Sequence, residues 1–346
     1  MNPTAVKLPE SVHLKQIIID IENRRQDLQS QDVCTTLSKI QPKFIESSFC
    51  NEIGHLMYLE LEVKKIRESS YNPTWEYSEI SEILRMPSKL ADANKYRKPS
   101  EWPLDMDTLA SNFFEISSAE KFLKEDEKGP IKRHWLVIDF ILSLEMAKIL
   151  PIYQNLNEND KVILFKKVGL INAILMQCFY SLENNSNTIL FPDGVMPLKM
   201  LFTVYKQFGV THASKLYIDT FCRSIETLHR IGIDSNEYVL LKAIIFCYPA
   251  VQNLSEEAQK LLRKQQEIYA LILLRHLQAR LGDIAGAKQY SDVITLIGTF
   301  FYFAECHKQT HIIPPVEMKQ ANPLCLENLQ RLYMNSTPRI LEKILL

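Results

Sequence analysis

The chain has 346 residues, of which 46% are hydrophobic, 40 are basic and 41 are acidic. This apolar content is enough for a large core, while a net charge of −1 argues against the strongly basic surface of a nucleic-acid-binding domain. The 9 glycines are few for a nucleotide-binding α/β enzyme or a β-sandwich. The 7 cysteines include no C-x-x-C pair, which indicates reduced thiols rather than a disulfide or zinc framework.

The first third of the chain predicts helical pieces around a few prolines. We interpret residues 1–50 as an extension or linker that includes a possible helix over Val12–Gln29, and residues 51–130 as a divergent helical part of the domain that follows. Glu52–Ser69 has one apolar face and predicts a helix. Residues 74–104 predict short helices around their prolines, and Asp105–Glu127 predicts another helix.

Two apolar stretches in the middle of the chain predict buried helices. Trp135–Leu150 and Val162–Leu182 are apolar nearly all round and lack the period of two that a strand shows. Pro151 weakens the end of the first helix, and Asn157 is a favourable N-cap for the second. No uncharged apolar run reaches about 18 residues, so we predict no membrane-spanning helix.

The connection between these helices resembles a family signature. The run Ala147–Lys166 is similar to that of the nuclear hormone receptor ligand-binding domain, with Pro151, Leu156, Asp160 and Lys161 at matching offsets. Glu237–Pro249 resembles a second motif of the same family. Leu56–Pro73 resembles the region before this domain in the expanded receptor families of nematodes. The resemblance implies an all-α, three-layered antiparallel helical sandwich with a small β-hairpin, whose core is residues 131–312 and whose divergent activation-helix region is residues 313–346.

The rest of the chain predicts that hairpin and a series of helices. Thr188–Phe191 with Asp193-Gly194 is a hairpin signal. Helices are expected over Pro197–Phe208, Thr211–Ile231, Asn236–Tyr248, from Ser255 to about Arg280, and over Tyr290–His311, with Gly282 and Gly286 bounding the last loop.

No constellation of residues typical of catalysis is present. We find no G-x-S-x-G, G-x-G-x-x-G or phosphate loop, and Asp139 and Glu145 lack a partner base or nucleophile. His307 and His311 lie on one helix face, as a metal site needs, but histidines at a helix end usually face solvent. We therefore expect no enzyme, no metal site and no cofactor.

The resemblance implies a surface that binds a short amphipathic helix, as coregulator proteins with leucine-rich helices require. Its cations would be Lys148 and Lys166, placed to meet helix carbonyls, although ordinary solvated lysines are the simpler interpretation. The lining would be Ile141, Leu144, Val162 and Phe165. The acidic side would come from an activation helix with Leu324, Glu327 and Leu329, where Asn328 breaks the family pattern. Alternatively, the tail Leu341–Leu345, close to L-x-x-L-L, occupies this groove.

A ligand pocket is the second implied site. It would be lined by Trp135, Leu136, Asp139, Leu142, Leu170, Ala173, Gln177 and Tyr180. Because Ala173–Leu182 contains no arginine or lysine, we expect a neutral apolar ligand or none, of unknown identity.

The resemblance implies a ligand-regulated transcription regulator in the nucleus, with the cytoplasm as a further location. A homo- or heterodimer through residues 290–311 is implied as well. The clustered cysteines of the family's DNA-binding modules are not recognisable here, so the sequence does not support direct DNA binding. The alternatives are a dimerisation module that modulates intact receptors and, less favoured, a helical lipid-binding carrier.

Overall fold

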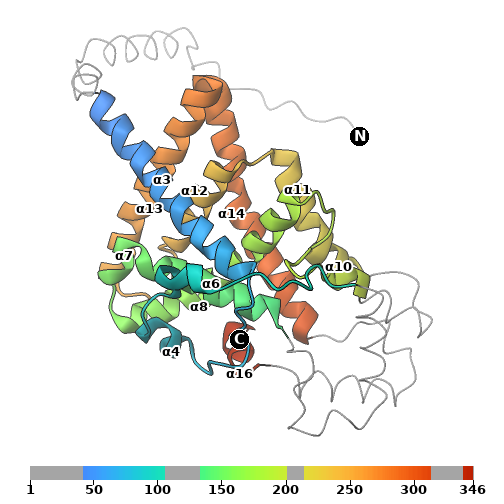
Figure 1. Cartoon of the computed structure of the whole chain (residues 1–346). Coiled ribbons are helices and arrows are strands. Elements are labelled where there is room, and N and C mark those ends of the chain that lie inside the picture. The colour runs from blue at the N-terminus through green and yellow to red at the C-terminus, as the bar shows by residue number, and fades with distance from the viewer. Residues whose placement is uncertain (1–41, 106–132, 201–213, 313–337, 346) are drawn as a thin grey trace, which may run out of the picture. The chain divides into compact units, whose positions relative to one another are not determined.

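The computed structural model describes residues 42–105, 133–200, 214–312 and 338–345. The chain divides into two units, Met1–Glu52 and Ile53–Leu346, and the second unit contains the features discussed below. Its described elements are helical (Figure 1). The expected helices over Val12–Gln29 and Asp105–Glu127 lie almost wholly outside the described residues.

Helices α6 (Trp135–Ile149) and α8 (Glu158–Glu183) form the centre of the core. Every α6 residue from Trp135 to Ala147 is buried, as expected for a helix that is apolar nearly all round. Pro151 opens the short α7 (Pro151–Gln154), and Asn157 caps α8 by accepting from the Asp160 N–H at 2.8 Å. The boundaries predicted from these two residues are confirmed.

Helix α8 packs against α6, α11 (Ser224–Ile231), α12 (Ser235–Phe246) and α14 (Asp283–Ile312). It is long and apolar enough to cross a membrane, but 78% of its most apolar window is buried inside the protein. Gly169 allows α6 to approach, since a Cβ there would lie 2.6 Å from the ring of Phe140. Helix α8 is therefore apolar because it lies in the core of the protein.

Helices α13 (Glu256–Leu281) and α14 pack together as an antiparallel pair (Figure 1). Ser255 caps α13 as predicted, with its hydroxyl accepting from the Ala258 N–H at 3.2 Å. The expected loop from Gly282 to Gly286 is wrong, because α14 begins at Asp283 and Gly282 alone makes the turn, with φ at +85°. Gly286 is instead a packing residue: a Cβ there would lie 2.6 Å from the backbone of Gln278.

The expected helix over Thr211–Ile231 is interrupted. Its described part consists of α10 (Lys215–Ile218), a π-helical turn at Asp219–Arg223 and α11, which ends at Gly232 with φ at +70°. Within the π-helical turn, the Phe221 carbonyl accepts from the Ile189 N–H at 2.9 Å and the Thr188 hydroxyl at 3.1 Å.

The all-α prediction is confirmed, but the small β-hairpin is not formed by the described residues 187–196. They contain no strand. The Leu190 N–H donates to the Ser181 hydroxyl at 2.9 Å and the Ile189 N–H donates to Phe221. Because helices supply these acceptors, the segment has no second strand to pair with and forms a turn, where the Phe191 N–H donates to Val195.

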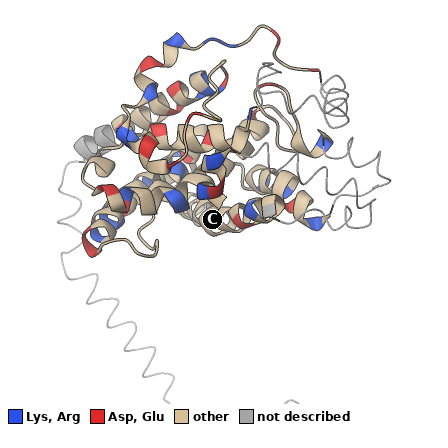
Figure 2. Cartoon of the chain, turned by 90° about the horizontal axis from the view of Figure 1, so that it is seen from below, with Lys and Arg blue, Asp and Glu red and all other residues tan. Residues whose placement is uncertain are grey.

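Helix α3 (Pro42–Arg67) is joined to three other helices by ion pairs. Glu60 pairs with Lys242 of α12 at 2.5 Å, Lys64 with Glu183 of α8 at 2.9 Å, and Arg67 with Asp139 of α6 at 2.6 Å. Basic and acidic residues are interspersed along the described helices (Figure 2), in keeping with the balanced composition.

Two short helices lie close to the α6–α8 core. They are α4 (Ile80–Arg85), which packs against α6 and α8, and α16 (Arg339–Leu345), which packs against α8. Lys343 of α16 pairs with Glu79, the N-cap of α4, at 3.0 Å. Between α4 and α6 in sequence lies a 3-10 helix, η1 (Lys89–Lys95). Both α4 and η1 fall within residues 74–104, where short helices were predicted.

Candidate functional site

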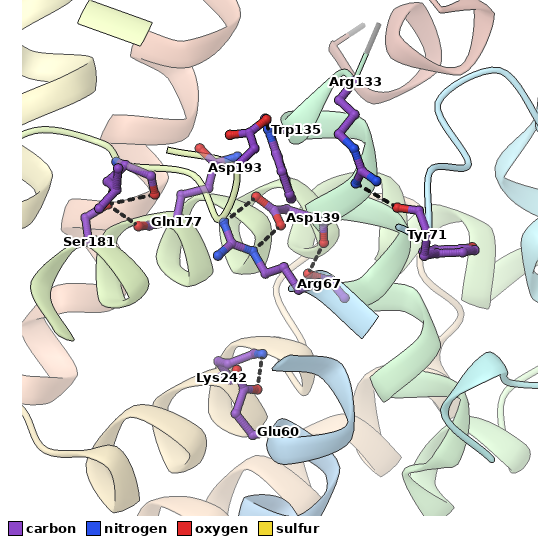
Figure 3. Close-up of polar contacts among 12 residues, drawn as sticks. Glu60, Arg67, Tyr71, Arg133, Trp135, Asp139, Gln177, Ser181, Asp193 and Lys242 are labelled. Carbon is purple, nitrogen blue, oxygen red and sulfur yellow. Dashed lines mark hydrogen bonds and ion pairs between the residues drawn. The ribbon is translucent and has the colours of Figure 1, made fainter. Parts of the chain in front are cut away.

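A buried ion pair joins α3 to the beginning of α6. The Nε of Arg67 donates to Asp139 Oδ1 at 2.6 Å and its Nη2 donates to Oδ2 at 3.1 Å, with both residues at most 2% exposed (Figure 3). Burial by itself lowers the pKa of Arg67, but the Asp139 carboxylate and its hydrogen bond raise the pKa overall. The Arg67 guanidinium therefore stays charged in the interior.

Aromatic rings surround this pair. The Arg67 guanidinium lies 4.6 Å from the ring centroid of Tyr180 and 5.5 Å from that of Trp135. The Trp135 indole stacks on Phe191 at 5.4 Å and donates to Asp193 Oδ2 at 2.8 Å. Burial raises the pKa of Asp193, although the hydrogen bond from Trp135 acts in the opposite direction.

The predicted pocket residues all lie on α6 and α8, and the structure gathers several of them around Arg67. Trp135, Asp139 and Tyr180 contact the guanidinium directly. Of these three, Tyr180 is part-buried. The other predicted pocket residues are at most 4% exposed: Leu136, Leu142, Leu170, Ala173 and Gln177. Sequence reasoning missed Arg67 itself, which lies 72 residues before Asp139. The sequence does not single it out, because Lys64 and Lys65 lie in the same last turn of α3 and only packing selects Arg67 for Asp139.

Several polar atoms beside this pair have no hydrogen-bond partner among the described residues. They are Nη1 of Arg67 and both amide atoms of Gln177, and Figure 3 shows these two side chains close to Asp139 and Asp193. A buried polar group without a partner loses free energy relative to its hydrated state. These atoms are therefore suited to a ligand oxygen or amide.

Lys148, at the other end of α6, caps the C-terminus of α4. Its Nζ donates to the carbonyl oxygens of Ile83 at 3.0 Å and Met86 at 3.1 Å, and it pairs with Glu145 at 2.8 Å. The second oxygen of Glu145 accepts from the Lys89 N–H at 2.7 Å. Burial lowers the pKa of Lys148, and the Glu145 carboxylate opposes this. A cation suits this position because helix carbonyls carry partial negative charge.

The remaining predicted groove residues lie in different environments. Ile141, Leu144 and Phe165 are at most 1% exposed, and Val162 is part-buried. Lys166 is exposed and lies near Lys308, whose pKa is lowered by burial and further by Lys167 and Lys166. The activation-helix candidates Leu324, Glu327 and Leu329 lie outside the described residues.

Three histidines meet where α6 begins and α14 ends. The ring of His311 lies 5.8 Å from that of His134 and 6.4 Å from that of His307, between centroids. His307 is 4% exposed, so the expectation that the His307–His311 pair faces solvent is wrong for this residue. Burial and the neighbouring imidazoles lower the pKa of His134 and His307 to about 3, and burial lowers that of His311 to about 4. Among the described residues, no group of three or more His, Cys, Asp or Glu could hold a metal ion.

The helical fold agrees with a match to a known family. Residues 133–293 match the model for the ligand-binding domain of nuclear hormone receptor, a stretch that includes α6, α8, α12 and α13. These residues, a little under half of the chain, are similar to this family of ligand-binding domains.

The similar proteins are nematode receptors. Nuclear hormone receptor family member nhr-60 of Caenorhabditis elegans is 27% identical over 321 residues, which cover 90% of this chain and 69% of that protein. Family members nhr-136 and nhr-124 of the same organism are 25% and 30% identical and are covered over 39% and 36% of their length. The chain thus spans less than half of these two relatives.

Removing one partner of the buried ion pair should destabilise the fold. Arg67→Met leaves Asp139 charged and unpaired, so we expect the free energy of unfolding to fall by about 3–5 kcal/mol in urea titrations. The double variant Arg67→Met, Asp139→Leu should lose clearly less than the sum of the single variants. Lys260→Ala, at an exposed pair, is the control and should leave stability almost unchanged. Additive losses in the double variant would contradict the interpretation.

The buried histidines should make the fold sensitive to acid. Their folded-state pKa values of about 3 to 4 lie below the unfolded value of 6.5, so below about pH 6.5 the unfolded chain binds protons that the folded chain does not. Each histidine should then reduce stability by up to about 1.4 kcal/mol per pH unit between roughly pH 6 and pH 4.

The measurement is urea unfolding at several pH values. His307→Leu should show a shallower loss of stability over this pH range than the wild type. The surface change His229→Gln should keep the wild-type slope. Equal slopes for all three proteins would contradict the assignment of the effect to His307.

Proposed function

We propose that the chain acts as a ligand-regulated transcription regulator of the nuclear receptor type, in the nucleus, through coregulator proteins with short leucine-rich helices. The observation that carries the proposal is the match of residues 133–293 to the receptor ligand-binding domain. Support comes from Lys148, because it contacts the C-terminal carbonyls of a short amphipathic helix. We further propose the division into an extension (1–50), a divergent helical part (51–130), a core (131–312) and an activation-helix region (313–346).

The ligand we propose is small, mainly apolar and uncharged. The predicted pocket residues are mostly apolar and buried, which suits an apolar body. The guanidinium of Arg67, which lies beside them, is already neutralised by Asp139. An acidic ligand would have to compete with this carboxylate, whereas a carbonyl or hydroxyl oxygen can accept from Arg67 Nη1 or the Gln177 amide.

Native mass spectrometry of the purified full chain, followed by denaturing extraction, tests this ligand. We expect an uncharged molecule of defined mass bound to the wild type. Gln177→Leu should weaken its binding by about tenfold, since a hydrogen bond to a neutral group contributes roughly 0.5–1.5 kcal/mol. The same variant should not lower the stability of the empty chain, because the amide has no partner among the described residues to lose.

The control is Gln259→Leu, on α13, which packs against α14, α12 and α7, and it should retain the ligand. An acidic extracted molecule would contradict the argument from the Arg67–Asp139 pair. A chain that emerges empty from several expression hosts would contradict the proposed ligand.

We also propose that the chain dimerises through residues 290–311, which belong to α14. Ser291, Thr295, Gly298 and Tyr302 are exposed at helical spacing on this helix. The neighbouring α13 exposes large apolar residues as well, Leu271 at 45% among them. Such exposure is typical of a surface covered by a partner. This feature also favours the second candidate function, a dimerisation module that modulates intact receptors.

Analytical ultracentrifugation distinguishes the two helices. A Cβ at Gly298 meets nothing within 4 Å, so Gly298→Arg should fold normally while preventing close approach of a second copy. We expect it to raise the dimer dissociation constant at least tenfold. Leu271→Arg, on α13, should have a smaller effect if α14 forms the dimer interface. A wild-type chain that is monomeric at all concentrations would contradict a homodimer, and a Gly298→Arg chain that dimerises normally would contradict this interface.

A further inference from the structure

Helix α4 has the features of a short peptide helix bound to a receptor surface. Its sequence Ile80-Ser81-Glu82-Ile83-Leu84 places apolar residues at i, i+3 and i+4, the spacing by which amphipathic helices enter apolar grooves. Ile80 and Ile83 are at most 3% exposed, while Glu82 and Arg85 are exposed. Helix α4 therefore presents one buried apolar face to the α6–α8 core and one polar face to solvent.

Both ends of this helix are held by polar contacts. At its C-terminus, Lys148 donates to the carbonyls of Ile83 and Met86. At its N-terminus, Glu79 and Glu82 form a capping box, and Glu79 pairs with Lys343 of α16. The contact with Lys343 is an exposed pair of weak expected strength. The contact with Lys148 is the strong one, since its side chain is 10% exposed and also pairs with the buried Glu145.

Helix α4 is short and buries few side chains against the core. The helix has six residues, too few to be stable alone, and only two of its side chains are fully buried. The helical state of α4 therefore depends on its packing against α6 and α8. A longer helix with leucines at the same spacing would bury more apolar area on this surface.

We propose that α4 is an internal occupant of the partner-helix surface beside Lys148, and that a partner helix binds by displacing it. This inference rests on the proposed function, since it names the regulation of the same surface. The competing occupant, the tail in α16, also packs against α8 with Ile340, Leu341 and Ile344 buried. Helix α4 is the occupant we assign, because its carbonyls and not those of α16 accept from Lys148.

The proposal predicts competition between α4 and an added helix. The probe is a fluorescein-labelled peptide with an L-x-x-L-L core, measured by fluorescence anisotropy against the full chain. Ile83→Ser removes a buried apolar contact of α4 and should raise peptide affinity at least tenfold, because the surface is then free in a larger fraction of molecules. Arg85→Ala, at an exposed position of the same helix, is the matched control and should leave the affinity unchanged.

A second measurement uses the unaltered chain, so that the test does not depend on the variant folding. Saturating peptide should speed hydrogen–deuterium exchange of the amides in residues 80–89, because displaced α4 loses its protection. The amides of α13, away from this surface, should not change. Lys148→Met should abolish peptide binding in both the wild-type and the Ile83→Ser background.

The outcomes separate the two claims. Peptide binding that depends on Lys148 but is not improved by Ile83→Ser, with unchanged exchange at residues 80–89, would overturn the role of α4 and leave the proposed partner binding intact. Absence of peptide binding in every protein would overturn the partner-binding function, and the role of α4 with it.

Discussion

The buried pair of Arg67 and Asp139 is the constraint on which the arrangement of the helices depends. Each charge removed from water costs several kcal/mol unless it meets its partner in good geometry. The two residues are 72 positions apart, so only one placement of α3 against α6 satisfies both. The guanidinium also contacts the rings of Trp135 and Tyr180. One side chain therefore orients α3, α6 and α8 together.

The same requirement explains the other polar residues of α6. Helix α6 is apolar except at Asp139, Ser143, Glu145 and Lys148. Three of these four side chains bind other segments of the chain. Asp139 receives Arg67, and the Ser143 hydroxyl donates within the helix to the Asp139 carbonyl at 2.8 Å. Glu145 accepts from the Lys89 N–H after α4, and Lys148 donates to the Ile83 carbonyl within α4. A helix buried all round can keep such groups only because each one is satisfied.

These attachments place the two proposed sites on one helix. The polar atoms of the proposed ligand site lie by Asp139. The proposed partner-helix surface lies by Lys148, nine residues further on, which is roughly 13 Å along the axis at 1.5 Å per residue. A ligand that changes the packing around α6 would thus act close to the residue that caps α4. Such a ligand shifts the equilibrium only by the difference in its affinity for the two arrangements.

Local chemistry by itself determined most of the helices of this protein. The apolar stretches of α6 and α8, Pro151, and the N-caps Asn157 and Ser255 act within one or two turns, so their effects are visible in sequence. The family signature likewise lies within one connection and its flanking helices. Only the tertiary structure decided the pairing of Arg67 with Asp139, the meeting of three histidines, the turn at residues 187–196 and the capture of α4 by Lys148. Each of these depends on groups far apart in the chain, whose desolvation and hydrogen bonding are settled by packing and leave no periodic pattern in the sequence.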